Sequence, residues 1–226
     1  MNKTGKSPST LSQNTRALER EQICSVGQSL FSRALTHGST GNISVRLDDG
    51  SFLMTPTGSS LGSLDPARLS YLDPNGQLLS GDAPTKESML HIAMYQQRER
   101  CKAVVHLHAA HAAAVSVLSD IDPDNVLPPL TAYYVMRVGE LPLVPYFPPG
   151  DAKLAEAVRA YAGRHHALLL ANHGPVVGGS SLSAAADAME ELEATAQMHL
   201  RLHGRGCRCL SPEQVAQIRR AFPIGC

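Results

Sequence analysis

The spacing of apolar residues predicts both helices and short strands along this chain. Over residues 15–35, apolar side chains recur at the three- and four-residue intervals of an amphipathic helix. Strict alternation over 43–47 and a returning run over 51–55, with Asp48-Asp49-Gly50 between them, predict a β-hairpin. Two longer apolar runs are expected to form buried strands, and they lie at 103–108 and 167–171.

Turn and capping residues predict the remaining elements. Pro142 favours a sheet edge or a strand start for a short strand at 141–144, because proline cannot donate to a strand ladder. A second hairpin is expected from 69–73 and 77–79, and further helices at 84–98 with Thr85 as N-cap, 109–115, 151–162, 182–202 and from 211 onward. Hairpin strands between flanking helices indicate a single-domain α/β fold with a largely antiparallel central sheet covered by helices.

The N-terminal segment differs in composition from the rest of the chain. Residues 1–13 are polar and rich in Ser, Thr and Lys, which favours a disordered tail. Residues 14–226 are expected to form one folded domain, because a chain of 226 residues with 43% hydrophobic side chains can bury a substantial core.

The strongest chemical signal lies in the predicted strand at 103–108. His106 and His108 are two residues apart, so their side chains leave the same face of a strand and can share a metal ion. Two hydrogen-bonded core histidines would give the same spacing. Two other residues favour the metal, because Glu87 opens the helix upstream and His173 follows the second apolar strand. Three imidazoles and a carboxylate suit Zn²⁺ or a similar divalent ion in a site with room for a substrate.

Glu87 also has a simpler explanation, since an acid in the first turn of a helix complements the helix dipole. A helix that delivers an acid to a metal on the next strand would carry it at the same position. Lys86, its neighbour, supplies a cation for an acidic substrate.

Loops rich in glycine and hydroxyl side chains flank the first hairpin. Gly41-Asn42 precedes it, and the segment 55–60, which contains Thr57 and Gly58, follows it. Such loops expose backbone N–H groups and hydroxyls to an anion, although the same residues dominate ordinary turns. Their positions at two neighbouring hairpin ends favour a phosphate-binding site.

Charge and cysteine content narrow the class of ligand. The 20 Lys and Arg residues balance the 20 Asp and Glu residues without a long run of either sign, so neither nucleic acid nor a membrane surface is an expected partner. The ligand should therefore be a small molecule. Five cysteines make no disulfide framework, and a metal site of Cys207, Cys209 and Cys226 would lack a fourth ligand, so free thiols in a reducing cytoplasm are expected.

These motifs together resemble the class II aldolase/adducin family, as in L-fuculose-1-phosphate aldolase. The resemblance covers about residues 17–202 and rests on Gly41-Asn42, the run 55–58, Glu87, the run 104–108 and His173-Gly174. A narrower resemblance is to the 3-oxo-tetronate 4-phosphate decarboxylase branch. It rests on Thr85-Lys86-Glu87 after Ser80-Gly81-Asp82 and on the runs 122–131 and 133–139.

The resemblance implies a homotetrameric lyase with one Zn²⁺, or another divalent ion, per subunit and with sites at subunit boundaries. The implied metal ligands are His106, His108 and His173, and Glu87 would be the acid/base that can also ligate the metal. The implied phosphate contacts are Asn42, Thr57 and Gly58. The aldolase has a Ser-Ser pair where this chain has Thr85-Lys86, so an additional acidic group on the substrate is expected to bind there. Tyr133 or Tyr134 is a candidate to assist proton transfer.

The implied reaction is the metal-dependent decarboxylation of a 3-oxo-tetronate 4-phosphate to dihydroxyacetone phosphate and CO₂ through a metal-stabilised enediolate. A class II sugar-phosphate aldolase of the fuculose or ribulose phosphate type is the alternative, because both reactions leave an electron pair that a divalent ion stabilises. An adducin-like non-catalytic module is disfavoured, since it would be expected to lack the metal ligands that are present here.

Overall fold

The structure is a computed structural model, and it describes residues 8–226. An eight-stranded sheet lies at the centre of this part of the chain. The strand order is β4-β3-β2-β1-β5-β8-β7-β6, and every neighbouring pair is antiparallel except β6 with β7. The strands are β1 (Asn42–Arg46), β2 (Phe52–Met54), β3 (Ser70–Leu72), β4 (Leu78–Ser80), β5 (Ala103–His106), β6 (Leu143–Val144), β7 (Ala167–Leu170) and β8 (Gly174–Gly179). The predicted α/β fold with a largely antiparallel sheet is confirmed.

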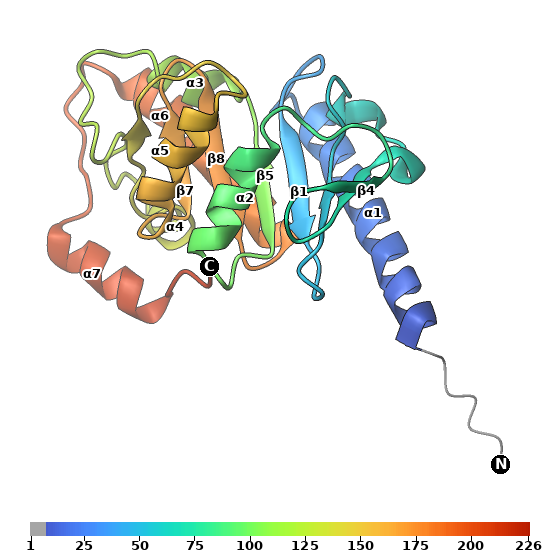
Figure 1. Cartoon of the computed structure of the whole chain (residues 1–226). Coiled ribbons are helices and arrows are strands. Elements are labelled where there is room, and N and C mark those ends of the chain that lie inside the picture. The colour runs from blue at the N-terminus through green and yellow to red at the C-terminus, as the bar shows by residue number, and fades with distance from the viewer. Residues whose placement is uncertain (1–7) are drawn as a thin grey trace.

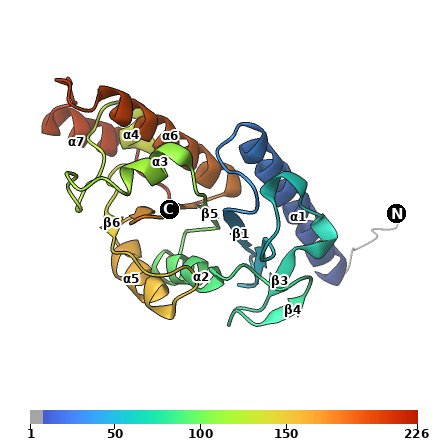
Figure 2. The same ribbon diagram turned by 90° about the horizontal axis from the view of Figure 1, so that it is seen from above.

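Helices cover both faces of this sheet (Figures 1 and 2). They are α1 (Pro8–Ser32), α2 (Ser88–Gln97), α3 (Ala110–Val115), α4 (Ala132–Arg137), α5 (Ala152–Ala162), α6 (Leu182–Leu202) and α7 (Pro212–Ala221), with short 3₁₀ turns η1 (Leu61–Ser63) and η2 (Pro66–Arg68). Figure 2 shows α2 and α5 on one face and α3, α4 and α6 on the other. None of the helices in residues 8–226 combines the length and apolar character needed to cross a membrane.

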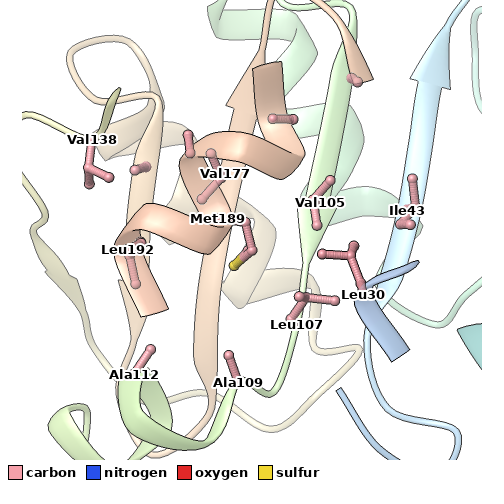
Figure 3. Packing of buried hydrophobic residues seen from close by; sticks show 14 of the residues in the cluster. Leu30, Ile43, Val105, Leu107, Ala109, Ala112, Val138, Val177, Met189 and Leu192 are labelled. Atoms are coloured by element: carbon pink, nitrogen blue, oxygen red, sulfur yellow. The ribbon is translucent and has the colours of Figure 1, made fainter. Parts of the chain in front are cut away.

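The alternation of side chains along the strands divides the core into two parts. Val105 of β5 belongs, with Leu30 of α1 and Leu192 of α6, to the larger cluster (Figure 3), whereas Val104 faces the cluster that α2 and α5 cover. His106 therefore follows Val104 toward α2. In β1, which pairs with β5, Ile43 belongs to the larger cluster, so Asn42 and Ser44 also face α2.

Several predicted boundaries shift in the structure. Helix α1 begins at Pro8, before the expected start at residue 15, and proline is favoured in the first turn of a helix. Residues 1–7 of the expected N-terminal tail lie outside the described residues. Strand β5 ends at His106, so His108 lies beyond it. The N-cap of α2 is Glu87 and not Thr85, whose hydroxyl instead accepts a hydrogen bond from the N–H of Glu87.

Strand β8 is absent from the expectations drawn from the sequence. Its residues Gly174, Gly178 and Gly179 lower strand propensity, yet the strand pairs with β5 on one side and β7 on the other. His166, which directly precedes β7, is buried. Its ring nitrogens lie 2.9 Å from the carbonyl oxygen of Gly178 and 3.1 Å from that of Val138.

Candidate metal centre and active site

Four side chains from three parts of the chain converge at one end of the sheet. They are Glu87 at the start of α2, His106 at the end of β5, His108 two residues later, and His173 in the turn between β7 and β8. One ligand atom from each lies within 4.8 Å of all the others. The structure therefore brings together all four residues that the sequence proposes as metal ligands.

Backbone geometry places Glu87 and His173 in this cluster. Glu87 has φ −98° and ψ 15°, a sparsely populated conformation in which its side chain makes no capping bond to α2. Asn172 adopts a left-handed conformation with φ 55° in the tight turn between β7 and β8. Asparagine tolerates this conformation better than most residues, and the turn projects His173 toward the other histidines.

Gly174 allows β8 to approach the segment that carries His108. A Cβ atom at position 174 would lie 2.3 Å from the carbonyl oxygen of Leu107 and 3.3 Å from the Cα atom of His108. No side chain fits at that distance. The glycine is therefore needed to keep His173 and His108 in contact, and their Nε2 atoms lie 3.0 Å apart.

Hydrogen bonding leaves one atom each of His106 and Glu87 free for a cation. The Nδ1 atom of His106 lies 2.9 Å from the carbonyl oxygen of Pro175, which can only accept, so Nδ1 carries the proton and Nε2 offers its lone pair. That Nε2 atom and Oε1 of Glu87 are buried, and within residues 8–226 neither has a hydrogen-bond partner. Such unpartnered atoms are costly unless an ion binds them, so the donor set fits a divalent metal.

The electrostatics of the cluster favour the ligand form of every member. Burial lowers the pKa of His106 and His108, and it lowers that of His173 to about 4, so all three rings are neutral at pH 7. Burial would raise the pKa of Glu87, but His106 and a 2.8 Å hydrogen bond from Nδ2 of Asn42 outweigh it and lower the pKa. Neutral imidazoles and an ionised carboxylate bind metal best.

A cavity of about 280 Å³ opens beside the cluster. Its lining includes His108, His173 and Glu87, together with the predicted substrate-binding residues Asn42, Thr57, Gly58, Thr85 and Lys86. Thr57, Gly58 and Lys86 are exposed to solvent there, whereas Asn42 and Thr85 are buried. The loops before and after the first hairpin therefore face the metal ligands across a single space.

The two tyrosines do not line this cavity. Tyr134 is fully buried in the larger core cluster, where burial raises its pKa and its hydroxyl has no hydrogen-bond partner among the described residues. Tyr133 is 60% exposed on α4. Within one chain, neither tyrosine joins the cluster of Glu87 and the histidines.

One residue of the site has no assigned role in the sequence analysis. His91 is fully buried, and its Nε2 atom lies 2.5 Å from Oδ1 of Asn42. The signal that could have found it is its position four residues after Glu87, since side chains one helical turn apart lie on the same face.

Comparison with known proteins agrees with this geometry. The model of the Class II Aldolase and Adducin N-terminal domain matches residues 21–200. The chain belongs to the class II aldolase/adducin family. Within this family, it is 49% identical over 200 residues to the 3-oxo-tetronate 4-phosphate decarboxylase of Escherichia coli strain K12, covering 88% of this chain and 94% of the relative.

Two other members show how the resemblance extends to structure and to a second activity. The crystal structure of YgbL from Escherichia coli superposes with a TM-score of 0.89 at 47% identity, covering 91% of this chain and 99% of the other. The L-fuculose phosphate aldolase of Escherichia coli strain K12 is 36% identical over 168 residues, which is 74% of this chain and 75% of the aldolase. Class II aldolases depend on divalent metals, and the cluster of three histidines and Glu87 fits that requirement.

Proposed function

We propose that this protein is a Zn²⁺-dependent decarboxylase that converts a 3-oxo-tetronate 4-phosphate to dihydroxyacetone phosphate and CO₂. The observation that carries the proposal is the convergence of Glu87 and three neutral histidines beside a cavity lined by Lys86 and the Thr57-Gly58 loop. The relative named for this activity matches this chain along nearly its whole length.

The proposed ligands are His106, His108, His173 and, in the resting enzyme, Glu87. A divalent ion held there supplies positive charge beside the substrate oxygens, which stabilises the negative charge that develops when the carbon–carbon bond breaks. The C1–C2 bond of the substrate breaks, CO₂ leaves, and C2 takes up a proton to become the hydroxymethyl carbon of the product.

Glu87 is the proposed proton shuttle to C2. Its Oε1 atom lies 3.4 Å from Nε2 of His173 and makes no hydrogen bond in the described part of the chain, so it is free to carry a proton. Its Oε2 atom is held by Asn42, which fixes the direction of the carboxyl group. A positioned acid/base of this kind typically contributes about 10²–10⁴-fold to the rate.

The remaining cavity residues are assigned to the two ends of the substrate. Thr57 and Gly58 expose a hydroxyl and backbone N–H groups at the rim, which suits the phosphate, and Gly58 has φ 70°. Lys86 lines the cavity and is assigned to bind the carboxylate before cleavage, with Thr85 supporting the loop through its bond to Glu87.

Assembly and location belong to the same proposal. Tyr133 is exposed and lies outside its own cavity, so it can assist the reaction only in the site of another copy. This arrangement agrees with a homotetramer whose sites lie at subunit boundaries. A reducing cytoplasm is proposed because the five cysteines are free thiols.

A class II aldolase that cleaves a fuculose or ribulose phosphate is the second candidate, because its metal and phosphate sites would use the same residues. The test is a panel of phosphorylated four-carbon 3-oxo acids and of sugar 1-phosphates, assayed with the zinc-loaded protein. The proposal predicts release of CO₂ and dihydroxyacetone phosphate in equal amounts from one of the oxo acids. Cleavage of fuculose 1-phosphate at a comparable rate would favour the aldolase.

A further inference from the structure

Glu87 is one end of a buried chain of five polar side chains that runs between β1 and α2. Oε2 of Glu87 lies 2.8 Å from Nδ2 of Asn42, and Oδ1 of Asn42 lies 2.5 Å from Nε2 of His91. The Nδ1 atom of His91 lies 2.7 Å from Oγ of Ser44, which lies 2.8 Å from the hydroxyl of Tyr95. All five residues are buried.

The ionised carboxylate of Glu87 determines which groups donate and which accept along these hydrogen bonds. An ionised carboxylate only accepts hydrogen bonds, so Asn42 must present its NH₂ group to Glu87 and its carbonyl oxygen to His91. His91 must then carry its proton on Nε2 and accept at Nδ1 from the hydroxyl of Ser44. Tyr95 donates to Ser44 in turn, so every hydrogen bond points toward Glu87.

The fold holds His91 in this tautomer. Asn42 and Ser44 are alternate residues of β1, and His91 and Tyr95 are one turn apart on α2, so the two pairs face each other across the packed interface. Burial lowers the pKa of His91 to about 3, which keeps the ring neutral as this arrangement requires.

We propose that His91 is a positioning residue that acts through Asn42 to orient Glu87, in the reaction proposed above. Without the N–H of His91, the amide of Asn42 is free to turn its oxygen toward Glu87, where it would repel the carboxylate. Glu87 would then lose the bond that aims it at the metal ligands. His91 itself is fully buried and does not line the cavity, so it would touch neither substrate nor metal.

The test is a double-mutant cycle read out as Zn²⁺ affinity, measured by chelator competition without substrate. Removing a hydrogen-bond partner of a metal ligand typically costs about 10–100-fold in affinity or activity. We expect His91→Leu and Asn42→Ala each to weaken Zn²⁺ binding about tenfold. The double variant should bind Zn²⁺ with an affinity no lower than that of the less tightly binding single variant, because both changes break the same series of hydrogen bonds.

Two further variants separate positioning from packing. His91→Gln can still donate to Asn42 through its amide and should recover most of the affinity, and it also serves as the test variant if His91→Leu fails to fold. His166→Leu removes another buried, doubly hydrogen-bonded histidine that lies outside the cavity, and it should leave Zn²⁺ affinity unchanged even if it lowers stability.

Turnover gives the second readout. With the oxo-acid substrate, His91→Leu should lower kcat about tenfold and change KM little, because His91 makes no contact with the substrate. Losses of affinity that multiply in the double variant, or a His91→Gln variant as impaired as His91→Leu, would overturn the proposal. If the wild type releases no CO₂, the proposed reaction fails, whereas the Zn²⁺ cycle still decides the role of His91.

Discussion

The Nε2 atoms of His108 and His173 lie 3.0 Å apart although the residues are 65 positions apart in the chain. Burial lowers the pKa of both rings, so neither carries a charge at neutral pH. In the structure the two atoms share a hydrogen bond, and a divalent ion held by both rings and by Glu87 beside them would take the place of that bond. This contact brings together the segment after β5, which carries His108, and the turn between β7 and β8, which carries His173.

Removing one imidazole should release the metal. We expect close to one divalent ion per chain in the purified protein and expect His108→Ala to lose both the ion and the activity, as measured by elemental analysis and product assay. His111→Ala is the matched control, because His111 lies close by but pairs with Glu193 and lies outside the cluster. Full activity in a rigorously metal-free preparation would contradict the metal site.

Glu87→Gln should separate proton transfer from metal binding. The amide keeps the size of the side chain but cannot exchange a proton, so kcat should fall about 10²-fold or more while the fold and most of the metal remain. Glu193→Gln provides the control, since Glu193 accepts hydrogen bonds from the N–H groups of His111 and Ala112 outside the cavity. Near-normal turnover in Glu87→Gln would leave Glu87 only a role at the helix terminus.

Gly174→Ala should damage the site through the backbone. The new Cβ would lie 2.3 Å from the carbonyl oxygen of Leu107, so β8 must move away from the segment that carries His108. We expect a loss of about 1–3 kcal/mol in the free energy of unfolding and weaker Zn²⁺ binding. Gly206→Ala, where the new atom meets nothing within 4 Å, should behave like the wild type in denaturant titration and in chelator competition.

Acid should destabilise the metal-free protein in part through His91. Its pKa is about 3 in the folded state, against about 6.5 in an unfolded chain, so the unfolded state binds the extra proton between these values. Stability contributed by the neutral ring is therefore present above pH 6.5 and is lost as the pH falls toward 3, by roughly 1 kcal/mol per pH unit. The His91→Gln variant should show a shallower dependence in denaturant titrations at pH 7 and pH 5; identical slopes would contradict the burial of a neutral ring.

Lys86 should affect substrate binding more than the chemical step. An ammonium group near the substrate carboxylate aids binding, but a tight grip on that carboxylate would stabilise the ground state and oppose loss of CO₂. We expect Lys86→Ser to raise KM for the oxo acid more than it lowers kcat. Lys153→Ser changes an exposed lysine outside the cavity and should alter neither constant, and an equal effect of both variants would remove Lys86 from the site.

Periodic patterns predict most of this fold because they depend on neighbours in the chain. The helices predicted at 182–202 and from 211 onward appear in the structure as α6 and α7, and a capping box at Ser211 begins α7. Strand β8 could not be predicted in this way. Its glycines are unfavourable in an isolated strand. Gly174 and Gly179 are needed because the backbones of Leu107 and Ala185 pass close to them, and a Cβ atom at Gly178 would lie 2.8 Å from Sγ of Cys101.

The residues of the site also differ in whether the sequence alone can predict them. The metal-ligand candidates follow from spacing and from their positions at element ends, so Glu87 and the histidines can be named from the sequence. The role of His91 depends on β1 packing against α2, which brings Asn42 and Ser44 to its two ring nitrogens. The position of His91 four residues after Glu87 indicates that the two residues share a helix face, but it does not indicate the contacts with β1. In the same way, nothing local indicates that His166 is buried.

The fate of the substrate carboxyl carbon tests the central claim most directly. The zinc-loaded protein would be incubated in D₂O with a 3-oxo-tetronate 4-phosphate carrying ¹³C in the carboxyl group, and the products followed by NMR and mass spectrometry. Decarboxylation predicts all the ¹³C in CO₂ and one equivalent of dihydroxyacetone phosphate with a single deuterium on its hydroxymethyl carbon. An aldehyde product without labelled CO₂ would contradict the account.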